Sequence, residues 1–405
     1  MSGKVLPFKY SLVVHEYCIR LQIRVSADSP DRVYSRLRLA GKTAMTIPCR
    51  QISVCVLLLA GMALAGCGGG AGTGSGNSLS FPDSEQPQSV PLQQDYDTAE
   101  YRENYGLDAI NAITAYEAGL SGAGITVAVI DSGIDLDHPD MDSAILDTST
   151  NIVTGNNTDV QDADVAHGHG TAVAGVIAAQ KNDAGIHGVA FNSSLLAISA
   201  VDPADCTEDE CSFSQADLAD GVDYARLQGA RVINLSLGGE AAGSTLTSAM
   251  RRAVEAGLTV VISAGNESQD APSDFAAMAG ADWANGQIII AGASNSSDAI
   301  ADFSNRAGDS LQDLFVVAPG VLVTTTDAGG AFKPFSGTSF SAPHVAGAMA
   351  LLLEQFPNLS ARDVVEILLT TARYLGDPGV DAVYGQGLVD LAAALAPAGP
   401  VSIAV

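Results

Sequence analysis

Positive charge is scarce over most of this 405-residue sequence. From Cys67 onward, 10 Lys and Arg residues stand against 43 Asp and Glu residues, which gives a formal charge of −33. So acidic a surface repels phosphate groups, because sequence-independent affinity for nucleic acids comes from Lys and Arg side chains that displace counterions. We therefore expect no nucleic-acid partner. We attribute the acidity to solubility, with calcium binding or a preference for basic substrates as alternatives.

The apolar run near the amino terminus is too short to span a membrane. It covers fourteen residues, 52–65, and is preceded by Arg50. A spanning helix needs about 20 apolar residues, whereas the core of a signal peptide needs about 7 to 15. The run ends in Leu-Ala-Gly before Cys67, which resembles the bacterial lipobox. We expect export, cleavage before Cys67 and lipidation of that cysteine. Gly68 fits delivery to an outer membrane, and an ordinary signal peptide with an incidental cysteine is the alternative.

The regions around this run do not have the pattern of a folded domain. Residues 1–44 are polar and basic, so we expect them to be untranslated or an extended leader, with residues 45–66 as the lipoprotein signal peptide. Residues 67–103 are rich in Gly and Ser and then in Pro, Gln and Asp. That composition predicts a flexible tether.

Cysteine is sparse as well. Of six cysteines, only Cys206 and Cys211 lie beyond the predicted lipid site. Export to an oxidising compartment favours a disulfide between them, which would close a small surface loop. A metal pair is the weaker alternative, because no further Cys or His lies nearby in the sequence.

From residue 104, short apolar runs alternate with longer amphipathic ones. The runs are near-continuously apolar, as strands buried on both faces of a parallel sheet are, and cover 125–130, 195–199, 232–236, 259–264, 288–291 and 315–317. Helices are predicted over 171–179, 214–228, 244–256 and 338–354, and from Ser360. This alternation predicts a doubly wound α/β fold, with a mostly parallel sheet flanked by helices. One domain is expected over 104–396, with a tail over 397–405.

Reactive side chains fall where such a sheet forms its crevice, at the carboxyl ends of the strands. Asp131 follows the first predicted strand, and two predicted helices begin near His169 and Ser339. Acyl transfer needs a hydroxyl nucleophile, an imidazole that takes and returns its proton, and a carboxylate that fixes the imidazole tautomer. We therefore predict Asp131, His169 and Ser339 as catalytic residues. Asn266 and the backbone N–H of Ser339 are predicted to form the oxyanion hole.

Five segments resemble, in order, the sequence blocks of the subtilase family of serine peptidases. They are VIDSGI at 129–134, HGTAVAG at 169–175, NLSLG at 234–238, SAGN at 263–266 and GTSFSAPH at 337–344. The order Asp, His, Ser is that of subtilisins. The resemblance implies a subtilisin-like three-layer sandwich and a serine endopeptidase that acts on proteins or peptides. It also implies that an extended substrate lies along the substrate-binding residues Ser236, Leu237, Gly238, Ala264 and Gly265.

The resemblance extends, through residues 187–190 and the Cys206–Cys211 loop, to subtilases that are autotransporter passengers. We expect neither the β-barrel of such proteins nor a folded prodomain in this sequence, so autotransport is not supported. The chain is expected to act as a monomer, attached to a membrane by lipidated Cys67, with no cofactor required for the chemistry.

A cluster of acids follows the first predicted strand. Asp135, Asp137, Asp140 and Asp142, with His138, offer hard oxygen ligands that favour structural calcium over zinc. Their spacing matches no EF-hand loop, so a solvated acidic turn is the preferred interpretation and the metal stays open.

Rival functions fit the motifs less well. A metallohydrolase built on His167 and His169 lacks a His-Glu-x-x-His segment, and an esterase of the α/β-hydrolase type would have Gly-x-Ser-x-Gly around its nucleophile. A catalytically silent binding lipoprotein is the main alternative, although none of the three catalytic residues is missing. We expect His344, within a buried helix, to make a structural hydrogen bond.

Overall fold

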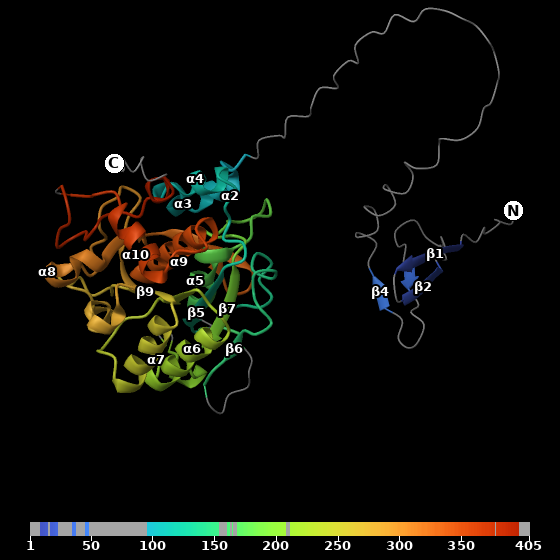
Figure 1. Cartoon of the computed structure of the whole chain (residues 1–405), viewed down its shortest axis with the longest axis horizontal. Coiled ribbons are helices and arrows are strands. Elements are labelled where there is room, and N and C mark those ends of the chain that lie inside the picture. Colours follow the sequence, from blue (N-terminus) through green and yellow to red (C-terminus); the bar gives the residue numbers. More distant parts are fainter. Residues whose placement is uncertain are drawn as a thin grey trace, which may run out of the picture. The chain divides into compact units, whose positions relative to one another are not determined.

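The computed structural model describes two compact units, residues 1–89 and 90–405 (Figure 1). The described residues are 9–14, 17–22, 35–37, 45–47, 95–153, 160–162, 164, 168–207, 211–376 and 378–396. In the first unit, β1 (Lys9–Val14) pairs antiparallel with β2 (Tyr17–Gln22), and β3 (Ser35–Leu37) with β4 (Met45–Ile47). The predicted lipid site Cys67 and His167 lie outside the described residues.

The second unit is built on a parallel sheet of seven strands in the order β11, β10, β9, β8, β5, β7, β6. The strands are β5 (Thr126–Asp131), β6 (Thr150–Asn151), β7 (Ser194–Ser199), β8 (Val232–Leu235), β9 (Thr259–Ser263), β10 (Ile288–Ser294) and β11 (Phe315–Pro319). The chain runs from β5 to β7 on one side and then crosses to β8 on the other. The carboxyl end of β5 is therefore a topological switch point, where α/β proteins bind ligands.

Both faces of the sheet are buried, which explains why the sequence runs that form its strands are near-continuously apolar. Successive side chains of a strand point to opposite faces. In β5, Val127 and Val129 belong to one hydrophobic core, and Ala128 and Ile130 to a second one. The same alternation continues along β7 to β11, so the sheet separates two cores.

Helices cover the two cores (Figure 1). The helices α5 (His169–Ala178) and α9 (Thr338–Gln355) pack on the first core, and α6 (Gln215–Leu227) and α7 (Ser244–Glu255) on the second. The first core also receives α2 (Ala99–Glu103), α3 (Tyr105–Ala109), α4 (Ala112–Glu117), α10 (Ala361–Thr370) and α11 (Leu391–Ala394). The result is the doubly wound, three-layer α/β fold that the sequence predicts.

The helix signals read from the sequence have a local cause in the structure. Ser214 accepts hydrogen bonds from the first amides of α6, and Ser360 forms a capping box with Asp363 at the start of α10. Helix α9 is buried along nearly its whole length, which matches its apolar, small-residue sequence.

The structure contains elements that were not predicted, among them the helices α3 and α4 and the short strand β6. A hairpin of β12 (Val323–Asp327) and β13 (Ala331–Phe335) was not predicted. Strand β10 continues to Ser294, three residues past its predicted end. The tether predicted over 67–103 ends earlier, because α2 occupies residues 99–103 and places Tyr101 in the first core.

The described residues contain no helix that is both long and apolar enough to cross a bilayer.

Candidate active site

Asp131 and His169 meet at the switch point of the sheet. Asp131 is the last residue of β5 and is 1% exposed, and His169 is the first residue of α5. The imidazole Nδ1 lies 2.8 Å from Asp131 Oδ1, which also accepts the backbone N–H of Ser132 at 2.8 Å. The carboxylate fixes the tautomer in which Nδ1 carries the proton, which leaves Nε2 able to accept one. The His169 side chain keeps 29% of its surface exposed, so the ring is open to a ligand.

The charge around His169 favours its protonated form. Burial of the ring acts to lower the pKa of His169, but the charge and hydrogen bond of Asp131 outweigh it. The carboxylates of Asp162 and Asp164 add to the increase, which brings the pKa of His169 to about 9. An imidazole with this pKa holds a transferred proton well and acts as a base at alkaline pH.

Ser339 lies in the first turn of α9, tied to the segment that follows β8. Its Oγ donates a hydrogen bond to the carbonyl of Ser236 at 3.2 Å, and the Ser236 hydroxyl donates to the carbonyl of Ser339 at 2.7 Å. The next residue, Phe340, has its ring 5.8 Å from the ring of His169. The predicted nucleophile is therefore the direct neighbour of a residue whose ring lies beside the predicted base.

Asn266 is oriented by Thr338, the first residue of α9. Its Oδ1 accepts both the backbone N–H and the hydroxyl of Thr338, each at 2.9 Å. Because a backbone N–H can only donate, these bonds fix which side of the amide is oxygen. The exposed Asn266 therefore presents its Nδ2 donor beside the start of α9, where Gly337 keeps the space open.

The five predicted substrate-binding residues form two adjacent segments, here called the two walls, one after β8 and one after β9. Ser236 and Leu237 lead from β8 to Gly238, and Ala264 leads from β9 to Gly265. A Cβ at Gly238 would lie 3.9 Å from the Cα of Gly265, so the two backbones approach closely. The Ser263 hydroxyl donates to the carbonyl of Leu237 at 2.9 Å and holds the walls together.

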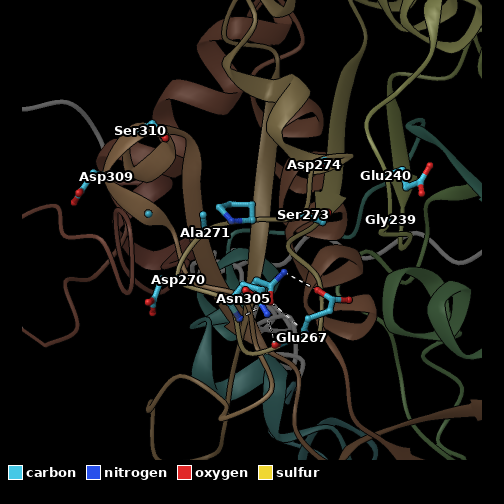
Figure 2. Close-up of a pocket in the computed structure, with 13 residues that line it drawn as sticks. Gly239, Glu240, Glu267, Asp270, Ala271, Ser273, Asp274, Asn305, Asp309 and Ser310 are labelled. Atoms are coloured by element: carbon cyan, nitrogen blue, oxygen red, sulfur yellow. Dashed lines mark hydrogen bonds between the residues drawn. The ribbon is translucent and has the colours of Figure 1, made fainter.

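An acidic cavity of about 850 Å³ adjoins these walls (Figure 2). Its carboxylates come from Glu240, Glu267, Asp270, Asp274 and Asp309. Asp270 pairs with Arg306 at 3.1 Å, whereas Glu267 accepts the neutral amide of Asn305 at 2.7 Å. The cavity therefore carries an excess of negative charge next to the start of α9.

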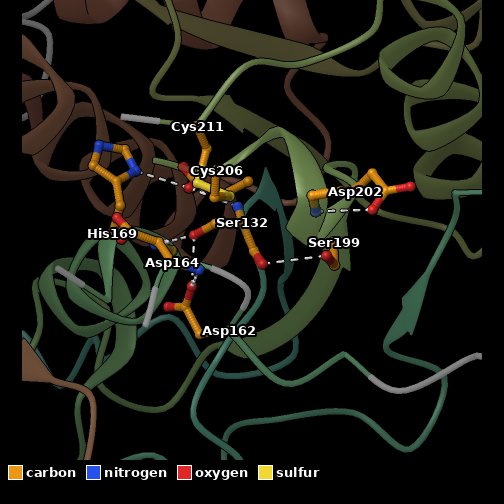
Figure 3. The surroundings of a disulfide bond; sticks show 11 residues. Ser132, Asp162, Asp164, His169, Ser199, Asp202, Cys206 and Cys211 are labelled. Carbon is orange, nitrogen blue, oxygen red and sulfur yellow. Dashed lines mark hydrogen bonds and ion pairs between the residues drawn. A yellow bond between two sulfur atoms is a disulfide. The ribbon is translucent and has the colours of Figure 1, made fainter. Parts of the chain in front are cut away.

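A disulfide joins Cys206 and Cys211 near the same crevice (Figure 3). Cys211 lines a cavity of about 460 Å³ together with Phe213, Leu218, Leu237 and Gly238. Two of the predicted substrate-binding residues, Leu237 and Gly238, thus share a cavity with Cys211 of the disulfide.

The acidic cluster after β5 is not a solvated turn throughout, because Asp135 and Asp140 are buried while Asp137 and Asp142 are exposed. The two buried carboxylates are used in separate contacts. Asp135 accepts the backbone N–H groups of Asp137 at 3.0 Å and of Gly329 at 2.7 Å, and Asp140 accepts the Asn182 amide at 2.6 Å. His138 lies 3.0 Å from the carbonyl of Ala331 through Nε2. Within the described ranges, no group of three or more His, Cys, Asp or Glu side chains has the arrangement of a metal site.

Two other histidines are buried and structural. His344 Nδ1 lies 2.7 Å from the carbonyl of Phe340, the structural bond expected from the sequence. His187 Nδ1 lies 2.9 Å from the carbonyl of Gly188, among the rings of Tyr101 and Tyr116. Burial lowers the pKa of both histidines to about 4.

Sequence reasoning missed Thr338 and Asp162. Thr338 orients Asn266, and Asp162 is a buried carboxylate beside Asp131 and His169. The sequence places Asp162 among several acidic residues of a polar loop, where no pattern distinguishes a buried carboxylate from a solvated one.

Comparison with known proteins agrees with this geometry. Residues 122–387 match the model of the subtilase family. The chain is 35% identical over 317 residues to subtilisin E of Bacillus subtilis, covering 76% of each chain. It is 36% identical over 297 residues to a subtilisin of Bacillus pumilus, covering 72% of this chain and 98% of that protein. A thermostable alkaline protease of Halalkalibacterium halodurans is 33% identical over 294 residues, 70% of this chain and 71% of the relative. The chain therefore belongs to the subtilase family and is a serine-type endopeptidase.

Proposed function

We propose that this protein cleaves peptide bonds through an acyl-enzyme formed on Ser339, with His169 as general base and acid and Asp131 as its partner. The 2.8 Å contact between His169 Nδ1 and the buried carboxylate of Asp131 carries the proposal. A buried acid on one ring nitrogen and an accessible second nitrogen are what proton transfer from a hydroxyl requires.

The reaction would proceed in two stages. Ser339 Oγ attacks the substrate carbonyl while His169 takes its proton, and the imidazolium then returns that proton to the leaving amine. Water repeats the sequence and releases the acid product. In the free enzyme the Ser339 hydroxyl donates to Ser236, and substrate binding would redirect it, since catalytic hydrogen bonds often tighten only in the complex.

The oxyanion that forms on the carbonyl would be held by two donors. Asn266 Nδ2 faces the start of α9, because its oxygen is held by Thr338. The backbone N–H of Ser339 lies in the first turn of α9, where amide groups have no partner inside the helix. Donors fixed before the reaction stabilise developing charge without reorganisation.

The substrate would bind as an extended chain along Ser236, Leu237 and Gly238, facing Ala264 and Gly265. The absence of side chains at Gly238 and Gly265 supports this path, because another backbone can approach glycine closely.

This chemistry uses only groups of the chain and needs no cofactor. Whether the fold holds a structural calcium ion is tested separately. The midpoint of thermal unfolding of the full chain is measured in EDTA and in excess calcium. A higher midpoint with calcium alone would assign a structural ion, and equal midpoints would show that the acids after β5 hold no calcium.

We further propose that the enzyme is exported and held at a bacterial membrane by a lipid on Cys67, and that it acts as a monomer. The lipobox at residues 64–67 supports the anchor. Metabolic labelling with a palmitate analogue should mark the protein, and Cys67→Ala should remove the label and release the activity from the membrane fraction.

The central test is casein hydrolysis by the full chain. Ser339→Ala should abolish cleavage, as should an irreversible serine-directed inhibitor, whereas Ser248→Ala, at an exposed serine of α7, should leave it unchanged. Cleavage that survives Ser339→Ala would refute the mechanism. A folded parent protein with no cleavage would favour the silent binding lipoprotein.

A further inference from the structure

Asp162 is a buried carboxylate whose charge acts on His169, and Figure 3 shows it hydrogen-bonded to Ser132, the residue after Asp131. Asp162 is 5% exposed. Its segment is held against the residues that follow β5, because the N–H of Ile134 donates to Val160 and the N–H of Asp162 donates to Ile134. A Cβ at Gly133 would lie 2.5 Å from the carbonyl oxygen of Val160, so only glycine permits this approach.

Four donors surround the Asp162 carboxylate. Oδ1 accepts the Ser132 hydroxyl at 2.7 Å and the backbone N–H of Asp164 at 3.1 Å. Oδ2 accepts the Thr171 backbone N–H at 2.9 Å and the Thr171 hydroxyl at 2.6 Å. The Ser132 oxygen already accepts the N–H of Gly170, and the Thr171 oxygen accepts the N–H of Asp135, so both hydroxyl protons are directed at Asp162.

This arrangement fits an ionised side chain. A protonated carboxyl must donate one hydrogen bond, and each of the four neighbours is itself a donor. Burial raises the pKa of Asp162 above its ordinary value and the charge of Asp131 adds to the increase, whereas the hydrogen bonds from Thr171 and Ser132 limit it. The amino-terminal amides of α5 add favourable charge.

Asp162 also joins the two elements that carry the proposed acid and base. Ser132 follows Asp131 at the end of β5, and Thr171 lies two residues after His169 in α5. Helix α5 has Gly168 at its N-cap and no side-chain cap of its own. The Ser132 hydroxyl and the Asp162 carboxylate instead accept the N–H groups of Gly170 and Thr171.

We propose that Asp162 is a positioning residue for His169: it anchors the start of α5 to the end of β5, and its negative charge stabilises the imidazolium that forms during acyl transfer. This inference rests on the proposed function, in which His169 is the base. It adds a second buried carboxylate, one that acts through Ser132, Thr171 and its electric field and touches no reacting atom.

The charged groups around His169 are mostly acidic. Among the described residues, Asp131 approaches from β5, and Asp162 and Asp164 from the loop before α5. From the hairpin, Asp327 lies near Gly168 and is paired with Lys333 at 2.9 Å. Loss of one carboxylate should therefore lower the proton affinity of His169.

The test compares Asp162→Asn with Asp202→Asn in the full chain. Asp202 caps the short helix η2 (Pro203–Asp205) after β7, where its carboxylate accepts the N–H of Ala204, so it controls for the loss of one charge. We expect Asp162→Asn to lower the midpoint of the acidic limb of kcat/KM by about half a pH unit or more. It should also lower kcat by about tenfold, with KM nearly unchanged. Asp202→Asn should change neither. A folded Asp162→Asn protein with the midpoint and kcat of Asp202→Asn overturns the proposal.

A second measurement separates this inference from the proposed function. The imidazole of His169 is titrated by NMR in Ser339→Ala proteins, with and without Asp162→Asn. The midpoint should fall in the double variant whether or not Ser339 is the nucleophile. An unchanged NMR midpoint overturns the role of Asp162, whereas activity of Ser339→Ala itself would overturn only the peptidase mechanism.

Asp162→Asn places an amide against backbone donors and could prevent folding, so a milder pair completes the test. Thr171→Val removes one hydroxyl from Oδ2 and keeps the carboxylate, and Thr171→Ser keeps the hydroxyl. We expect Thr171→Val to lower kcat severalfold and Thr171→Ser to retain it. Equal kcat values in Thr171→Val and the parent protein would refute the anchoring role.

Discussion

At the scale of single residues, the proposed role of Asn266 as oxyanion donor can be tested separately from the Asp131 and His169 pair. The Asn266 oxygen is held by Thr338, so replacement by alanine removes the outward Nδ2 donor without disturbing Asp131 or His169. We expect Asn266→Ala to lower kcat by about a hundredfold or more and to leave KM within a few fold, because one lost oxyanion donor weakens the transition state more than substrate binding. Asn192→Ala, at an exposed position, is the control. A fall confined to KM would contradict the assignment.

The pKa of His169 makes a prediction about pH. In the proposed mechanism the neutral imidazole is the base, and the pKa of His169 is about 9, above the ordinary value of 6.5. We therefore expect kcat/KM on a neutral peptide to rise about tenfold per pH unit below the midpoint and to level off only in the alkaline range. Stopped assays between pH 5 and 10 measure the acidic limb of the kcat/KM profile. The enzyme is checked for unfolding at each pH. A midpoint at or below 6.5 would show that the carboxylates do not act on His169 as argued.

At the scale of elements, the start of α5 depends on two glycines. A Cβ on Gly170 would meet the carbonyl oxygen of Gly133 at 2.1 Å, and backbone cannot yield as a side chain can. We expect Gly170→Ala to lower the free energy of unfolding by about 3 kcal/mol and to reduce activity, because α5 must move away from β5. Gly221→Ala in α6 is the comparison. There the nearest atom is a methyl carbon of Ile130 at 3.1 Å, and we expect a change of about 1 kcal/mol or less. Urea unfolding measures the free energy of unfolding of both variants. Equal losses in Gly170→Ala and Gly221→Ala would contradict the prediction.

The elements also show what the sequence could and could not predict. The runs that form β5 and β7 to β11 could be recognised because both faces of each strand are buried, so apolar residues dominate them and polar ones such as Asn234 in β8 are few. The hairpin of β12 and β13 could not be predicted. Its second strand carries Lys333 and Pro334 and is largely exposed, so it has neither an apolar run nor a clean alternation. Its position depends on contacts of Thr325 and Thr326 with α5, which are distant in sequence.

The same limit applies to the site. Asp131, His169 and Ser339 stand in short local motifs at predicted strand and helix ends. Asp162 has no local motif, because its partners Ser132 and Thr171 come from elsewhere in the chain and only the fold assembles them.

At the scale of the whole molecule, net charge should select substrates. From Cys67 onward the formal charge is −33, and the cavity next to α9 is lined by five carboxylates. We expect kcat/KM for a Lys-rich or Arg-rich peptide to exceed that for an acidic peptide of equal length, and the difference to shrink with added salt. The measurement is kcat/KM at low and high ionic strength, with an uncharged peptide as control. Equal salt dependence for all three peptides would argue against electrostatic selection.

Acid should destabilise the fold through its buried histidines. His187 and His344 have pKa values of about 4 in the folded protein, against 6.5 in the unfolded chain. The unfolded state therefore binds more protons between pH 6.5 and 4, and stability falls as the pH drops through that window, by roughly 3 kcal/mol per histidine at its lower end. His187→Phe, in a Ser339→Ala protein to prevent autolysis, should flatten this dependence. Urea midpoints between pH 4.5 and 7.5 test it, and a slope equal to that of the parent would refute it.

Thr338 connects parts of the site that come from different elements. It begins α9, precedes Ser339 and holds Asn266, which follows β9. A small displacement of α9 should therefore carry the proposed nucleophile and the proposed oxyanion donor together, and the distance between them should fluctuate less than either position does. The geometry that thermal motion can change is then chiefly the placement of His169, on α5, relative to this pair.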